Sequence, residues 1–268
     1  LMKTLVGALC AMLLTLVPFV AAVAAPLKLV IHEESGAEGE PLPPISRYAA
    51  LRRALETALT RPVEITLTRD RQRVYEWMER NQADVFMTNA ADLAARALTS
   101  LGYNFIATAR PDVTVLFIGK GAPVDNLKAL SGFAISMPKP ETMFGQVCTA
   151  ELRDFIAKQY TARASSEYAA VVYAVENNLS PVGCIPSHSR ARDTLQAKGI
   201  KVVYEGRPQP ALPVIASLGL PAADRAAIAK VLTNFEEGAA GDSALKSLGV
   251  TGFTEGGETR LRMLNSWL

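Results

Sequence analysis

The sequence contains few of the residues on which metal and nucleophilic chemistry depend. It has only two histidines and three cysteines, without a C-x-x-C spacing, so a zinc site is not expected. It also lacks a G-x-S-x-G sequence. Ser187 and His188 are neighbours at the end of an expected strand, where adjacent side chains point apart and cannot form a catalytic dyad. We therefore expect a binding protein with no catalytic residues, no metal and no cofactor, in preference to a hydrolase or transferase.

Charge of one sign is not in excess. The chain has 28 Lys and Arg against 26 Asp and Glu, a formal net charge of +2. Nucleic-acid-binding proteins carry a basic surface, and such a balance does not supply one. We expect no nucleic acid among the partners.

Long apolar runs are confined to the N-terminus. Lys3 precedes an uncharged stretch from Leu5 to Val20, and small residues follow at 21–25. This order predicts a secretory signal peptide, residues 1–24, cleaved after Ala24. A membrane anchor is the alternative, but the run is short for a span and contains Pro18.

The cysteines fall into two groups. Cys10 lies in the predicted signal peptide, so cleavage leaves Cys148 and Cys184. Export would permit a disulfide between them. Two buried free thiols are the alternative.

Apolar strands alternate with amphipathic helices along the rest of the chain. Such alternation predicts an α/β fold with a mainly parallel sheet flanked by helices. Strands are expected near residues 27–32, 63–67, 83–87, 103–109, 114–120, 133–137, 181–185, 200–204 and 212–220. Helices are expected near residues 45–59, 74–78, 89–98, 147–160, 168–175, 191–198, 222–237 and 243–248.

Three turns follow expected strands, and ligands of such sheets bind outside the carboxyl ends of the strands. The turns are 32–35, 88–89 and 137–143. The third also opens a helix, whose first N–H groups lack partners and carry the positive end of the peptide dipoles. Candidate ligand-binding residues on and around these turns are Glu34, Tyr48, Thr88, Asn89, Lys139, Glu141, Thr142, Tyr168 and Ser187.

Several candidates have a structural alternative. Lys139 is equally consistent with a solvated loop residue, and Glu141 and Thr142 with helix-capping residues. A tyrosine such as Tyr48 is more often a core residue than a ligand contact, although aromatic side chains also line the rims of binding sites. Arg47 beside it could pair with an anion, or lie on the surface.

A family resemblance is carried by blocks spread over most of the chain. They are 48–51, 62–65, 83–86, 114–120, 126–132, 168–183, 220–221 and 249–253. Their order resembles the periplasmic phosphate/phosphite/phosphonate-binding proteins of ABC transporters, which have the type 2 periplasmic binding fold. The resemblance implies two lobes: residues 25–110 with 212–268, and residues 111–211. Two crossings are expected, near 109–113 and 205–212.

The same resemblance implies a function. Family members capture a small anionic or polar solute between the lobes in the periplasm. A monomer serving an inner-membrane ABC permease is therefore expected. The sequence leaves open a sensor or an accessory protein of a signalling or redox system, and, less favoured, a periplasmic hydrolase.

The ligand loop departs from the family pattern. Where the family has D-P-x-S-x-S-G, this chain has M-P-K-P-E-T-M at 137–143, so only Pro138 and Thr142 match. Pro181 stands in place of a family acid, and Tyr168 in place of a frequent histidine. Glu141 would repel an oxyanion at close range. The resemblance therefore does not imply that this chain binds a phosphonate, and we expect its binding site to differ in shape from the family's.

Overall fold

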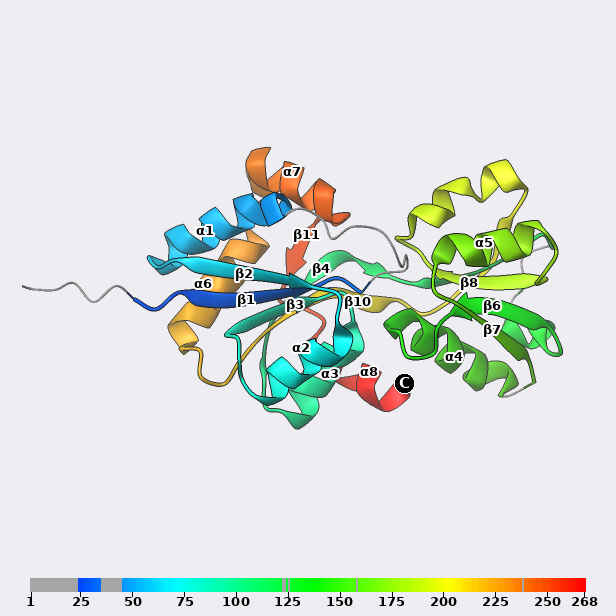
Figure 1. Cartoon of the computed structure of the whole chain (residues 1–268), viewed down its shortest axis with the longest axis horizontal. Helices are drawn as coiled ribbons and strands as arrows, with labels where there is room; N and C mark the ends of the chain where they lie inside the picture. Colours follow the sequence, from blue (N-terminus) through cyan, green and yellow to red (C-terminus); the bar gives the residue numbers. More distant parts are fainter. Residues whose placement is uncertain (1–23, 35–44, 122–123, 125, 158, 238) are drawn as a thin grey trace, which may run out of the picture.

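Two separate sheets organise the chain in the computed structural model, which describes residues 24–34, 45–121, 124, 126–157, 159–237 and 239–268. One sheet has six strands in the order β11-β4-β10-β3-β1-β2, and the other has five in the order β7-β6-β8-β5-β9 (Figure 1). We call the first sheet with its helices lobe 1, and the second lobe 2. Nearly all of the predicted signal peptide, with Cys10, lies outside the described residues, as does Ser35.

Lobe 1 is a sheet between two helical layers. Its strands are β1 (Leu27–His32), β2 (Val63–Thr68), β3 (Val85–Thr88), β4 (Asn104–Val113), β10 (Gln209–Ala216) and β11 (Gly252–Thr254). Its helices are α1 (Ala49–Leu59), α2 (Arg71–Glu79), α3 (Ala91–Ser100), α6 (Ala222–Thr233), α7 (Ala239–Leu248) and α8 (Glu258–Trp267). Helices α1, α6 and α7 cover one face, and α2, α3 and α8 cover the other (Figure 1). Both faces are buried, which explains why β1 and β3 are apolar nearly throughout.

Lobe 2 has the same layering on a smaller scale. Its strands are β5 (Val115–Gly119), β6 (Ala134–Pro138), β7 (Thr161–Ser165), β8 (Val182–Pro186) and β9 (Lys201–Glu205). Its helices are α4 (Met143–Ile156) and α5 (Tyr168–Glu176). Short 3-10 helices lie in both lobes, at Ile45–Tyr48, Leu127–Leu130, Arg190–Thr194, Gln196–Lys198 and Phe235–Glu237.

The strand directions correct one prediction. Both sheets are mixed, where mainly parallel sheets were expected. Pairs β1–β2, β1–β3, β6–β7 and β6–β8 are parallel, whereas β3–β10, β4–β10, β4–β11, β5–β8 and β5–β9 are antiparallel. The antiparallel pairs all involve the strands that enter or leave the two crossings, or β11 at the edge. The chain enters β5 and β10 from the other lobe, so no βαβ crossover leads into them, and each is antiparallel to both of its neighbours.

The chain passes between the two sheets twice. The first is at Thr114, between β4 and β5, and the second is at 206–208, between β9 and β10. The expected lobe limits at 110/111 and 211/212 fall inside β4 and β10, which both belong to the first sheet.

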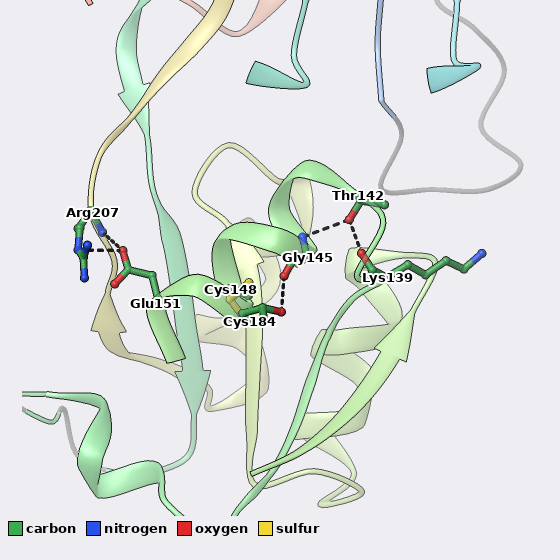
Figure 2. The surroundings of a disulfide bond; sticks show 8 residues. Lys139, Thr142, Gly145, Cys148, Glu151, Cys184 and Arg207 are labelled. Atoms are coloured by element: carbon green, nitrogen blue, oxygen red, sulfur yellow. Dashed lines mark hydrogen bonds and ion pairs between the residues drawn. A yellow bond between two sulfur atoms is a disulfide. The ribbon is translucent and has the colours of Figure 1, made fainter. Parts of the chain in front are cut away.

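A disulfide joins Cys148 on α4 to Cys184 on β8 (Figure 2). Their Cα atoms are 6.4 Å apart, and both residues are fully buried. Of the two states that the sequence left open, the structure contains the bridged one. It fixes α4 to the sheet of lobe 2.

A buried carboxylate lies against the second crossing. Glu151 on α4 is fully buried, and its Oε1 accepts a hydrogen bond from the Arg207 backbone N–H at 2.7 Å (Figure 2). Oε2 has no hydrogen-bond partner in the described part of the chain. Gly206 leaves room for this contact, because a Cβ there would lie 2.8 Å from Val115 Cγ2 and 3.2 Å from Glu151 Oε1.

We expect Glu151→Gln to stabilise the protein increasingly as the pH rises. Burial raises the pKa of the Glu151 carboxyl, against the opposing effect of the Arg207 N–H. The folded state thus binds this proton more tightly than the unfolded state, and the wild type loses stability as the pH rises from the ordinary glutamate pKa through the raised one. Glutamine cannot ionise. Urea unfolding of both proteins from pH 4 to pH 8 checks this; a difference that stays constant or shrinks with pH would contradict it.

Candidate functional site

The carboxyl ends of β1 and β3 form the floor of the candidate site. His32 ends β1 and Thr88 ends β3, and the two strands run parallel with these residues in register. The Thr88 hydroxyl lies 2.8 Å from His32 Nδ1 and accepts a hydrogen bond from the Ala90 N–H at 3.0 Å. Both side chains are fully buried. The tips of these strands are therefore tied to each other.

His32 is held neutral at the pH of most environments. Burial, and secondarily the charge of Arg71, lowers the pKa of its imidazole to about 4. Its Nε2 has no hydrogen-bond partner among the described residues. A protonated imidazole here would be a buried charge beside a guanidinium.

Asn89 holds the backbone of Glu34. Its Oδ1 accepts from the Glu34 N–H at 2.6 Å, and its Nδ2 donates to the Glu34 carbonyl at 3.1 Å. This double contact fixes the turn after β1. The backbone of Glu34 therefore stays with lobe 1, while its side chain points toward lobe 2.

Glu34 bridges the two lobes. Its Oε2 accepts from the Met143 N–H, at the start of α4 in lobe 2, at 2.7 Å. Its Oε1 accepts from Arg71 Nη1, in lobe 1, at 2.9 Å. The Glu34 side chain is only 9% exposed, so both contacts are largely shielded from water.

A second bridge lies beside the first. Arg71 forms a bidentate ion pair with Asp92, through Nη1–Oδ1 at 3.1 Å and through a closer Nη2–Oδ2 contact. Gln146 Nε2 on α4 donates to Asp92 Oδ2 at 3.4 Å. Two carboxylates of lobe 1 therefore face the first turns of α4, with one arginine between them.

The loop before α4 is built by Thr142. This residue is the N-cap: its Oγ1 accepts from the Gly145 N–H at 3.1 Å and donates to the Lys139 carbonyl at 2.7 Å (Figure 2). A Cβ at Gly145 would lie 1.9 Å from the Lys139 carbonyl oxygen, so only glycine permits this packing. Thr142 satisfies one of the free N–H groups of the helix start, and Met143 offers another.

Comparison with known proteins shows which family this arrangement belongs to. Residues 44–259 match the family described as "ABC transporter, phosphonate, periplasmic substrate-binding protein". The chain belongs to this family. No curated protein matches it.

Solved structures with the same fold include relatives of this phosphonate-binding family. XAC2383 from Xanthomonas citri bound to ATP has a TM-score of 0.70 at 17% identity, covering 90% of this chain and 96% of that one. PhnD1 from Prochlorococcus marinus in complex with methylphosphonate has a TM-score of 0.70 at 12% identity, covering 91% and 97%. A binding protein component of a phosphonate ABC transporter from Pseudomonas aeruginosa has a TM-score of 0.64 at 14% identity, covering 90% and 86%. The predicted family and the two-lobe type 2 periplasmic binding fold are confirmed.

The structure brings part of the predicted set together. Glu34, Thr88, Asn89 and Thr142 lie where the tips of β1 and β3 meet the start of α4. Tyr168, the first residue of α5, is half-buried; burial and the Glu34 charge raise the pKa of its phenol. These five residues, with Arg71, Asp92 and Gln146, are called the cleft set below.

The other predicted residues lie elsewhere or face outward. Tyr48 is buried in the core of lobe 1, and its hydroxyl donates to Glu33, which also pairs with Arg47 at 3.2 Å. Ser187 ties the first crossing: its Oγ accepts from the Thr114 N–H at 3.1 Å. Glu141 is exposed. The Lys139 side chain extends away from α4 (Figure 2).

Three members of the cleft set escaped sequence reasoning. Arg71 follows an N-cap aspartate, and Asp92 and Gln146 lie in the first turns of helices. These positions are ordinary for charged and polar residues on solvated helices. The sequence did offer a sign that Asp92 could belong to the site, because Asp92 follows Thr88 and Asn89 closely, just after the carboxyl end of a strand.

Two kinds of site do not occur in the described ranges. There, no group of three or more His, Cys, Asp and Glu residues is placed to hold a metal ion. Nor is any helix of those ranges long and apolar enough to cross a bilayer.

Proposed function

We propose that this family member is exported to the periplasm as a monomer, captures a small polar solute between its lobes and presents it to an inner-membrane ABC permease. The observation that carries the proposal is the convergence of β1, β3 and α4, where side chains of both lobes meet. Proteins of this architecture bind solutes by closing one lobe on the other. The family is one of substrate-binding proteins, and we assign no catalytic residue to the chain.

The cleft set supports a polar solute in particular. It combines hydroxyl, amide, guanidinium and carboxylate groups around the start of one helix. A few convergent polar groups in a concave site fix the orientation of a small ligand. Solute would replace the contacts that the lobes now make with each other.

A thermal-shift screen tests the function. The panel is phosphonates, phosphite, sulfonates, small carboxylates and amino acids, added to the purified protein. A solute that binds the folded state alone raises the melting temperature with the logarithm of its excess. The proposal is wrong if neither this panel nor a broader set of neutral and cationic metabolites shifts the melting temperature.

For any solute found, we expect the double variant Thr88→Ala/Asn89→Ala to bind roughly tenfold more weakly or worse, since it loses four hydrogen bonds at the strand tips. Titration calorimetry measures the affinity. Thr57→Ala, at an exposed position on α1, is the matched control and should bind as the wild type does. Equal affinity of the double variant and the wild type would remove these two residues from the site.

A further inference from the structure

The start of α4 is occupied by the protein's own carboxylate. The first N–H groups of a helix have no partner within the helix and attract anions. Here Thr142 takes the N–H of Gly145, and Glu34 takes the N–H of Met143 at 2.7 Å. An anionic solute approaching this helix would meet a position that is already filled by a negative charge.

The nearest cation is also engaged by carboxylates. Arg71 donates to Glu34 at 2.9 Å and forms its bidentate pair with Asp92. The side chains of Glu34 and Asp92 are 9% and 5% exposed, so little water screens them. One guanidinium faces two carboxylates, and the three side chains together carry a net negative charge.

The backbone of Glu34 is held in place, so only its side chain could give way to a solute. Asn89 clamps its backbone N–H and carbonyl from below, at 2.6 and 3.1 Å. A solute oxyanion would have to break both side-chain contacts of Glu34 and would then lie close to the displaced carboxylate. Like charges a few ångströms apart in a shielded site repel strongly.

We propose that Glu34 is a specificity determinant that excludes phosphonates, phosphate and other dianions from the cleft. The solute of the wild type then carries no phosphonyl or phosphate group. This inference rests on the proposed solute-binding function and narrows its ligand class.

The test uses Glu34→Gln, which keeps the shape of the side chain without its charge, and Glu34→Ala, which empties the position. Methylphosphonate and inorganic phosphate are the probes, with calorimetry and thermal shift at low ionic strength. Glu64→Gln, at an exposed position near the opposite end of the sheet, controls for net charge. Circular dichroism confirms that the variants are folded, and having two variants allows the test to proceed if one is not.

We expect no binding of either probe to the wild type or to Glu64→Gln at millimolar concentration, and a gain in affinity of about tenfold or more in a Glu34 variant. Tight binding of methylphosphonate to the wild type, or no gain in a folded Glu34 variant, would overturn the inference. If that happens while the wild type still binds another solute in the screen, the proposed function stands and only the role of Glu34 fails.

Discussion

Removing the Cys148–Cys184 disulfide is expected to lower the free energy of unfolding by about 4 kcal/mol, because the bond closes a loop with a sequence separation of 36 residues. Cross-linking reduces the conformational freedom of the unfolded chain, and the variant Cys148→Ala/Cys184→Ala restores that freedom. For a chain of this size the melting temperature should fall by about 8–16 °C. Urea unfolding at pH 7 and calorimetry measure the two quantities.

Reduction provides the control for this prediction. Unfolding the wild type in the presence of dithiothreitol should reproduce most of the loss, whereas the alanine variant should not respond to the reductant. The exported wild type, denatured without reductant, should show no free thiols. Two free thiols there, or a variant as stable as the wild type, would contradict the prediction.

Acidification is expected to destabilise the wild type by about 3 kcal/mol more than the variant His32→Asn between pH 7 and pH 4. The pKa of His32 is lowered from 6.5 to about 4 in the folded state, mainly by burial. The folded state therefore binds this proton more weakly than the unfolded state. The stability linked to His32 is present above pH 6.5 and is lost as the pH falls toward 4.

Asparagine is the matched replacement for His32. It cannot take up a proton in this range, yet its amide can reach the Thr88 hydroxyl that now contacts Nδ1 at 2.8 Å. The other ionisable groups, including His188 and Arg71, are common to both proteins and cancel in the difference. Urea unfolding at several pH values gives that difference. A value that is the same at pH 7 and pH 4 would show that His32 does not titrate as its burial requires.

Much of the fold was predictable from the alternation of strands and helices. The strands that escaped the prediction lack that pattern: β7 (Thr161–Ser165) is an edge strand with four exposed residues of five. Helix α8 buries only Leu261 and Leu264, too short an apolar stripe to stand out. A helix was predicted at 191–198, where two 3-10 helices lie. Strand direction was wrong for the strands beside the crossings, because it depends on where the chain changes lobe.

The candidate site was predictable only in part. Glu34, Thr88 and Asn89 follow buried strands, and the rule that ligands bind at strand tips selects them without a structure. Arg71 enters because it pairs with Asp92 in lobe 1, and Gln146 enters because it reaches Asp92 from lobe 2. That meeting depends on how the lobes face each other, which local sequence does not encode. Tyr48 was misleading for a related reason: its ring fills the core, and only its hydroxyl reaches a polar group, Glu33.

Helix α4 links the two ends of lobe 2 mechanically. Its first residue, Met143, donates to Glu34 of lobe 1, and Glu151, in its second half, accepts from the Arg207 N–H in the second crossing. Cys148, between them, is joined to β8 of the sheet by the disulfide with Cys184. We therefore expect both ends of α4 to move together with the sheet of lobe 2. In the proposed closing of the lobes, we expect lobe 2 to rotate as one body about the connecting segments.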